Sequence, residues 1–395
     1  MVTTVASPPA RLAAPAVAGS FLTLFVLGLL VSSIGPLLPG LRSEFEVGPA
    51  AAGMLVASVP TGGLAGVLVS TVIARRFDTR VLLTLACAAL ALGQLGTAFA
   101  PGWGLLLASG VVTGIGYGAV TSFVNGMIAA VYGARSTVLL NLTNGAFGVG
   151  AVLGPLCVAV VPAGSGRLVY AGYAALAALA PVLFASLVPG TPNSPGHGVE
   201  RGGSGGHPGR LALFALVFAC YVAVEVATGG WITTHLRAVS FDADSAVFAT
   251  SLFFAGLATG RIVAAPVGLR VGPGPMLFAC ALFACAGLLL AWAAPLGGFA
   301  YFLTGMAMGP IFPTGLAWVA QDQPSARFAI PTMLVAGNIG GLLLPPLVGV
   351  LVGAVGAAAA PLPLAASAGV CALAVGALLL HARRPIPSAS AARSF

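Results

Sequence analysis

Long apolar segments alternate with short polar ones along almost the whole chain. Twelve segments consist mostly of apolar residues over about 20 positions each, the length at which a helix crosses a bilayer. They cover approximately residues 17–40, 50–73, 81–100, 104–130, 137–161, 168–188, 211–233, 246–268, 275–294, 298–320, 328–353 and 362–381. The pattern therefore predicts an all-α membrane protein with twelve transmembrane helices.

The composition agrees with a chain that lies mostly in lipid. Hydrophobic residues make up 59% of it and charged residues 6%, whereas soluble domains are about one-quarter charged. The six cysteines contain no Cys-x-x-Cys pair and the four histidines are scattered, so no metal or haem site is predicted. The chain has no lysine, which argues against a P-loop nucleotide site and a Schiff-base cofactor. We expect no cofactor.

The arginines are divided unequally between the two sides of the predicted membrane. If the N-terminus is cytoplasmic, twelve of the sixteen basic residues face the cytoplasm, Arg42, Arg167 and Arg237 face outward, and Arg261 lies within the eighth segment. Short cytoplasmic loops are enriched in basic residues. We therefore expect a multi-pass protein of the plasma (inner) membrane with both termini in the cytoplasm. The net charge of +8 is spread over many loops and does not indicate nucleic-acid binding.

A segment rich in Gly, Pro, Ser and His divides the twelve predicted spans into six and six. Residues 189–210 form this segment, and it reads as a flexible cytoplasmic linker. The predicted units are thus a tail 1–16, a bundle 17–188, the linker 189–210, a bundle 211–381 and a tail 382–395. Paired six-helix bundles are typical of transporters that bind a solute between the bundles, near the bilayer midplane.

Glu225 is the only acidic residue inside any of the apolar segments. A carboxylate at membrane depth costs about 2.5–3.5 kcal/mol, so such a residue usually faces a cavity, a partner or a proton path. One interpretation is a carboxyl group that binds a proton when buried and releases it when its cavity opens to water. The alternative is a structural glutamate that hydrogen-bonds between helices. Tyr221 lies one turn earlier on the same helical face, and Thr228 or Gly229 lies one turn later.

A second polar face is predicted in the fourth segment. Tyr117, Thr121 and Asn125 are spaced by four residues, which places them on one side of a helix. They are candidates for a cavity wall, although a Thr or Asn in a membrane helix also bonds to its own backbone or bridges neighbouring helices.

Several motifs resemble the major facilitator superfamily over roughly residues 20–381. Asn141 to Pro155 resembles the family's Gly-x-x-x-Gly-Pro motif, and Gly309 to Thr314, Gly337 to Pro346 and Tyr221 to Trp231 are similar to the sugar-transporting branch around fucose permease. The resemblance implies two six-helix bundles related by a pseudo-twofold axis. It also implies cavity roles for Asn144, Asn338, Trp231 and Phe312, the last two as apolar faces for a ring; plain packing is the alternative for each.

The same resemblance points to candidate gating residues. Gly154 and Pro155 predict a helix kink that seals or opens the outer pathway, or one that serves packing alone. The segment from Ala74 to Arg80 resembles the family's inner-loop signature but has Arg75 where the pattern has Asp and Asp78 where it has Gly. In the family this loop holds the two halves together through charge pairs. Arg75, Arg76 and Asp78 would therefore form a different set of such pairs, or they are ordinary residues of a basic cytoplasmic loop. Arg261 follows Gly260, and the family often has a Gly-Arg pair at this position. We expect the Arg261 side chain to reach backbone carbonyls or a carboxylate and to have a structural or gating role.

The chain departs from the fucose permease pattern at the proton-linked carboxylates. Where that branch has acids in helices 1 and 4, this chain has Gly35 and Thr121, while Asn125 matches the branch's asparagine one turn later. We therefore expect a sugar-like cavity with different coupling, in which Glu225 is the proton-coupling candidate.

The sequence predicts a secondary transporter that moves a small polar or sugar-like solute by alternating access, with protons as the candidate coupling ion. The alternative is a proton-antiport exporter of drugs or secondary metabolites, and a non-transporting receptor or scaffold is a minor one. No enzyme is expected, because no two candidate catalytic groups lie close together in the spans. The expected partners are the small-molecule substrate, protons and the lipid bilayer, and the expected state is a monomer.

Overall fold

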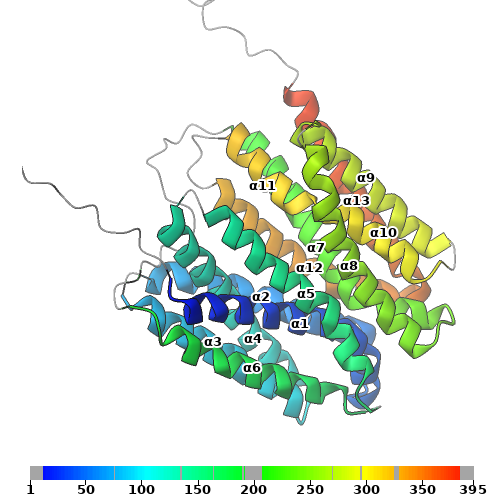
Figure 1. Ribbon diagram of the computed structural model, residues 1–395. Helices are drawn as coiled ribbons and strands as arrows, with labels where there is room; N and C mark the ends of the chain where they lie inside the picture. Colours follow the sequence, from blue (N-terminus) through cyan, green and yellow to red (C-terminus); the bar gives the residue numbers. More distant parts are fainter. Residues whose placement is uncertain are drawn as a thin grey trace, which may run out of the picture.

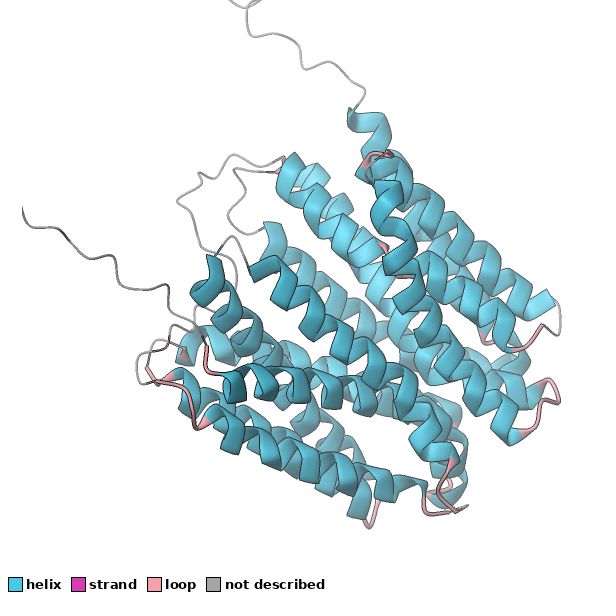
Figure 2. Ribbon diagram, in the orientation of Figure 1, coloured by secondary structure: helices cyan, strands magenta, loops and turns pink. Residues whose placement is uncertain are grey.

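The computed structural model describes residues 12–74, 76–133, 136–162, 164–188, 191, 207–268, 270–293, 296–323 and 329–382. The secondary structure of these residues is helical, and short loops join the helices (Figure 2).

Six helices of the first half are α1 (Ala14–Glu44), α2 (Pro49–Ile73), α3 (Thr79–Phe99), α4 (Trp103–Tyr132), α5 (Ser136–Ala159) and α6 (Val169–Phe184), with the short turn η2 (Gly166–Leu168) before α6. The second half holds α7 (Pro208–Ala238), α8 (Ala243–Gly268), α9 (Pro273–Ala293), α10 (Gly298–Met308), α11 (Ile311–Asp322), α12 (Ala329–Val355), η3 (Ala357–Ala359) and α13 (Pro361–Ala382). Within the described residues these helices make twelve candidate membrane spans. The prediction of twelve spans is confirmed.

The structure divides the tenth span into two α-helices. The apolar pattern predicts one helix over 298–320, whereas α10 ends at Met308 and α11 begins at Ile311. Pro310 and Pro313 cause the interruption, because proline lacks the N–H that would continue the helical hydrogen bonds. Discontinuous helices are tolerated in a membrane only where neighbouring groups satisfy the freed carbonyls.

The two halves of the chain form two bundles with matching internal contacts (Figure 1). In the first bundle α1 packs on α5 and α6, α2 on α4, and α3 on α6; in the second, α7 packs on α12 and α13, α8 on α10, and α9 on α13. Each pair in one bundle thus has its counterpart six spans later. This repetition is the pseudo-twofold arrangement that the sequence predicts.

Glycines allow neighbouring helices inside each bundle to pack closely. A Cβ atom at Gly28 of α1 would collide with the carbonyl of Phe147 in α5, and one at Gly150 of α5 would collide with the carbonyl of Phe25 in α1. Membrane helices gain no hydrophobic driving force from each other, so van der Waals contact between closely packed backbones supplies much of their association.

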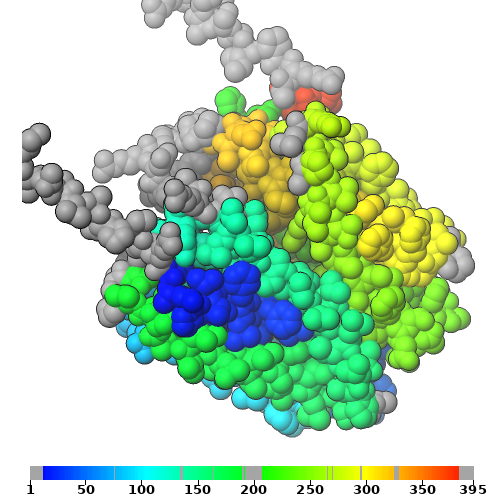
Figure 3. Space-filling view, in the orientation of Figure 1, coloured from blue at the N-terminus to red at the C-terminus, as the bar shows by residue number. Residues whose placement is uncertain are grey.

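The bundles meet along α1 and α7, α2 and α12, and α5 and α8. Side chains of α5 and α8 touch on the near face of the molecule (Figure 3). We call the α1–α7 and α2–α12 contacts the seam: Gly35 packs on the carbonyl of Gly229, and Gly53 packs on Pro345 and Pro346. A larger side chain at Gly35 or Gly53 would meet backbone atoms of the other bundle, so the seam requires glycine at both positions.

The seam lies at one end of the molecule. Its residues belong to the C-terminal parts of α1, α7 and α12 and to the N-terminal part of α2. Toward the opposite end, where α1 begins, α6 ends, α7 begins and α13 ends, the two bundles diverge (Figure 1). The structure is therefore closed at one end and splayed at the other.

Candidate functional site

Four side chains from both bundles form a charged cluster between them. Tyr117 of α4 interacts electrostatically with Glu225 of α7 and Arg261 of α8, and Tyr221 of α7 interacts with the same two charges. We call Tyr117, Tyr221, Glu225 and Arg261 the central cluster. Tyr117 belongs to the first bundle and the other three to the second, so the cluster joins the two halves.

Arg261 is held in place by the interruption between α10 and α11. Its Nε donates a hydrogen bond of 3.3 Å to the carbonyl of Gly309. Because Pro313 has no N–H, this carbonyl lacks its helical donor four residues later. Close packing brings the two together, since a Cβ at Gly260 would collide with the carbonyl of Met306. The rest of the guanidinium interacts with Tyr221 and Glu225.

Glu225 and Arg261 lie near one another without a direct ion pair among the described residues. The ion pairs that the described residues form are Arg167–Glu44 at 2.5 Å and Arg210–Asp322, and neither includes a residue of the cluster. Glu225 is half-buried. Its negative charge and the positive charge of Arg261 nevertheless balance, which lowers the cost of placing either in the membrane.

Several buried polar atoms around the cluster have no hydrogen-bond partner among the described residues. They include the hydroxyls of Thr121 and Thr228 and the side-chain oxygen of Asn125. Buried polar groups are normally hydrogen-bonded to protein or to water. Unpaired donors and acceptors at this point therefore indicate a place for water or for a polar ligand. Thr121 and Asn125 are two of the sequence-predicted site residues.

Asn338 and Phe312 extend this site on the second bundle. The side-chain amide nitrogen of Asn338 donates a hydrogen bond to the carbonyl of Leu334 at 2.9 Å. The side-chain oxygen of Asn338 takes no part in this bond. A Cβ added at Gly63 of α2 would lie 3.4 Å from this oxygen and 4.0 Å from the ring of Tyr117. Phe312 packs on Tyr221, with ring centroids 6.0 Å apart. The structure thus brings Asn338 and Phe312 next to the tyrosines of the cluster.

Comparison with known proteins decides the class of this membrane protein. The family model of the Major Facilitator Superfamily matches residues 20–321. The chain belongs to this superfamily. It is a secondary transporter and not an enzyme. Over 155 residues it is 27% identical to the sodium-dependent glucose transporter 1A of Mus musculus, and the match covers 37% of this chain and 36% of that protein. The chain thus matches about a third of the length of this curated relative.

Solved transporter structures share the fold. The nucleoside transporter NupG, in a variant form, superposes with a TM-score of 0.75 at 14% identity and covers 92% of this chain and 99% of its own. The xylose transporter XylE from E. coli superposes with a TM-score of 0.74 at 14% identity, covering 91% and 96%. At this identity the likeness establishes the fold of the transporter, two six-helix bundles with twelve spans.

Two sequence-predicted substrate residues of the transporter lie outside the central cluster. Trp231 is 0% exposed, and its indole N–H donates to the carbonyl of Pro345 at 3.3 Å, so it lies at the seam. Asn144 is exposed on α5 and bonds to the carbonyl of Leu140 at 2.7 Å. Their proposed contact with substrate stays a prediction.

The predicted gating residues of the transporter are distributed over three places. Gly154 packs on the hydroxyls of Ser32 and Ser33 in α1, next to Pro155 and within the first bundle. Arg75 lies outside the described residues, while Arg76 and Asp78 are exposed before α3. Among the described residues, neither side chain makes a hydrogen bond or ion pair to the second bundle. Only Arg261 belongs to the central cluster.

Sequence reasoning missed two features of the site. It treated Thr228 only as a neighbour of Glu225, and it did not connect Arg261 with the interruption of the tenth span. The second feature had a signal, because Pro313 follows Gly309 by four residues and so must leave that carbonyl free. Which residue satisfies the carbonyl depends on the packing of α8 against α10.

Proposed function

We propose that this transporter moves a small polar, sugar-like solute across the plasma membrane by alternating access, and that protons carried by Glu225 drive it. The observation that supports this proposal best is the position of the central cluster between the bundles, among buried polar atoms without partners. A solute that supplies hydroxyl groups satisfies such atoms. Aromatic rings of Tyr117, Tyr221 and Phe312 offer faces for a sugar or nucleoside ring.

The charges of the cluster favour a neutral solute. Glu225 contributes one negative charge and Arg261 one positive charge, so no unbalanced charge awaits an ionic ligand. Protonation of Glu225 would leave the positive charge of Arg261 without a balancing negative charge. The protonation state of Glu225 would therefore alter the strength of the interactions that join the second bundle to Tyr117 of the first bundle. This is the physical basis that we propose for proton coupling.

The seam supports alternating access. With both termini in the cytoplasm, the splayed end of the molecule is the cytoplasmic one and the seam seals the outer end. The structure then corresponds to a conformation open toward the cytoplasm. Opening the seam and closing the opposite end would expose the same cluster to the outside.

Transport assays in proteoliposomes test the function. Purified protein is reconstituted, and uptake of labelled monosaccharides and nucleosides is measured with a pH gradient, with a sodium gradient and with neither. We expect accumulation driven by the pH gradient. The mouse relative is described as sodium-dependent, so accumulation driven only by sodium would replace protons as the coupling ion. Efflux of lipophilic dyes without sugar or nucleoside uptake would favour the proton-antiport exporter instead.

The role of Glu225 is tested separately from the substrate. Glu225→Gln should retain exchange of labelled for unlabelled solute but lose accumulation against a gradient, because it keeps the hydrogen-bonding shape and cannot release a proton. Glu46→Gln is the control, since Glu46 is exposed in the loop between α1 and α2. Undiminished gradient-driven accumulation by Glu225→Gln would remove the proton role.

A further inference from the structure

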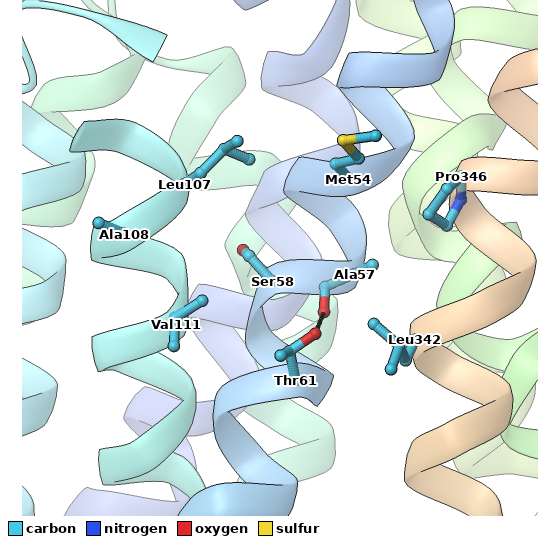
Figure 4. Close-up of a pocket in the computed structure, with 9 residues that line it drawn as sticks. All are labelled: Met54, Ala57, Ser58, Thr61, Leu107, Ala108, Val111, Leu342 and Pro346. Atoms are coloured by element: carbon cyan, nitrogen blue, oxygen red, sulfur yellow. Dashed lines mark hydrogen bonds between the residues drawn. The ribbon is translucent and has the colours of Figure 1, made fainter. Parts of the chain in front are cut away.

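A crevice of about 270 Å³ lies between α2, α4 and α12 (Figure 4). Its walls come from both bundles, with Leu107 and Ala108 on α4 of the first bundle and Leu342 and Pro346 on α12 of the second. The crevice is separate from the central cluster and plays no part in the proposed solute site.

The lining of the crevice is apolar even where the sequence supplies hydroxyl groups. Ser58 donates to the carbonyl of Leu55 at 2.6 Å. Thr61 donates to the carbonyl of Ala57 at 2.8 Å (Figure 4). Both hydroxyl protons are therefore used within α2. A cavity whose walls offer no free donors stays dry and accepts hydrocarbon.

The mouth of the crevice is continuous with the surface that faces the bilayer. At this end of the molecule the bundles touch, so exposed side chains point away from the protein. Met54 at the mouth is 53% exposed. On α12, Leu343 and Leu347 directly follow the lining residues Leu342 and Pro346, and they are 62% and 52% exposed. All three lie in membrane-spanning helices. The phase in contact with the opening is lipid.

We propose that the crevice binds an acyl chain of a bilayer phospholipid. From Met54 at the mouth to Thr61 on the floor, the crevice follows α2 over seven residues, about 10 Å at the helical rise. A narrow apolar slot of this length suits a flexible hydrocarbon chain and has no group that would orient a polar solute. The floor residues Ala57 and Ser58 are 2% and 5% exposed, so a chain that reaches them has entered the crevice.

The bound chain contacts both bundles and therefore acts on the conformational equilibrium. Leu342 and Pro346 move with the second bundle, whereas the floor and the α4 wall move with the first. Separation of α2 from α12 removes one wall. A ligand that binds one conformation more tightly shifts the population toward it, so the acyl chain stabilises the closed seam.

Photolabelling in the bilayer tests the proposal. The full-length protein is reconstituted with a phosphatidylcholine that carries a diazirine on one acyl chain, irradiated, digested and mapped by mass spectrometry. We expect adducts on the floor from Ala57 to Thr61. Ala108→Phe fills the crevice from an exposed position and should lower floor labelling about fivefold, while labelling of lipid-facing Leu105 stays unchanged. Ala88→Phe, on the exposed face of α3, is the matched control.

Two results would overturn the proposal. One is the absence of floor adducts in the wild-type protein when Leu105 is labelled, which would mean that chains pass over the crevice without entering. The other is floor labelling that persists in Ala108→Phe, or that a transported solute displaces, which would assign the space to another occupant. Because the first result needs no variant, the test does not depend on how Ala108→Phe folds.

Discussion

Arg261 donates its Nε hydrogen bond to the carbonyl of Gly309, the acceptor that Pro313 leaves without a helical partner. This hydrogen bond satisfies the carbonyl that the interruption of the tenth span leaves free. It also fixes the position of a positive charge beside Glu225. The planar guanidinium allows both, because its donors point in several fixed directions.

Arg261→Lys should separate charge from geometry. Lysine keeps the positive charge but carries a single flexible ammonium group, which cannot hold the Gly309 carbonyl and face Glu225 in the same fixed arrangement. We expect solute exchange in proteoliposomes to fall by up to about a hundredfold, the cost of a misplacement on the order of 1 Å at a functional site. Arg270→Lys, at an exposed position, should leave exchange unchanged. Full exchange by Arg261→Lys would show that charge alone suffices.

Gly63→Leu tests whether the space between Tyr117 and Asn338 belongs to the solute path. A Cβ there already lies 3.4 Å from the Asn338 oxygen, and a leucine side chain would extend between the two residues. We expect exchange of solute to be abolished while the Tm in detergent changes by a few degrees at most. Gly104→Leu is the control, because Gly104 has nothing within 4 Å of an added Cβ. Normal exchange by Gly63→Leu would place the path elsewhere.

Gly53→Leu should hold the seam open. Its side chain would meet the backbone of Pro345 and Pro346 in the other bundle, and packed backbones do not yield as flexible side chains do. The readout is a cysteine introduced at Val56, which is 4% exposed in the closed seam. Its labelling by a membrane-impermeant maleimide should accelerate about tenfold, a population shift worth roughly 1.4 kcal/mol.

The control for the seam is Gly48→Leu, since an added Cβ at Gly48 has nothing within 4 Å. Equal labelling rates in the two backgrounds would mean that the α2–α12 contact does not hold this end closed.

Asp322→Asn should destabilise the second bundle. Arg210 forms an ion pair with Asp322 and also donates to the carbonyl of Leu378 at 3.4 Å, so it ties together α7, α11 and α13. The two side chains are only 15% and 16% exposed. The substitution removes the balancing negative charge and replaces one of the two acceptor oxygens with an NH2 group, which we expect to cost about 2 kcal/mol. Thermal unfolding in detergent measures this as a lower Tm, and the exposed Asp244→Asn should not change it.

The apolar pattern was sufficient to predict the twelve spans, because the cost of exposing a helical backbone or polar side chain to lipid leaves few alternatives for segments of this length. It was not sufficient for the break at Gly309–Pro310, since prolines also occur within the continuous helices α1, α2 and α12. Whether a proline bends or divides a span depends on which neighbour satisfies the freed carbonyl.

Among the candidate site residues, the periodicity of α4 and α7 placed Tyr117, Thr121 and Asn125 on one helical face and Tyr221 with Glu225 on another. That these faces approach each other, and that Arg261 completes the cluster, depends on how two bundles dock. Trp231 shows the limit of local reasoning: it lies six residues after Glu225 in sequence, yet it is buried at the seam.

The amino-acid sequence by itself determined the number of spans, the division into two halves and the single membrane-embedded acid, because these follow from transfer of residues between water and lipid. The tertiary structure alone decided which helices meet across the halves, which carbonyl Arg261 satisfies and where the crevice between α2, α4 and α12 opens. Those features depend on contacts between backbones distant in sequence, permitted by glycines such as Gly35, Gly53 and Gly260 at crossings that no local pattern specifies.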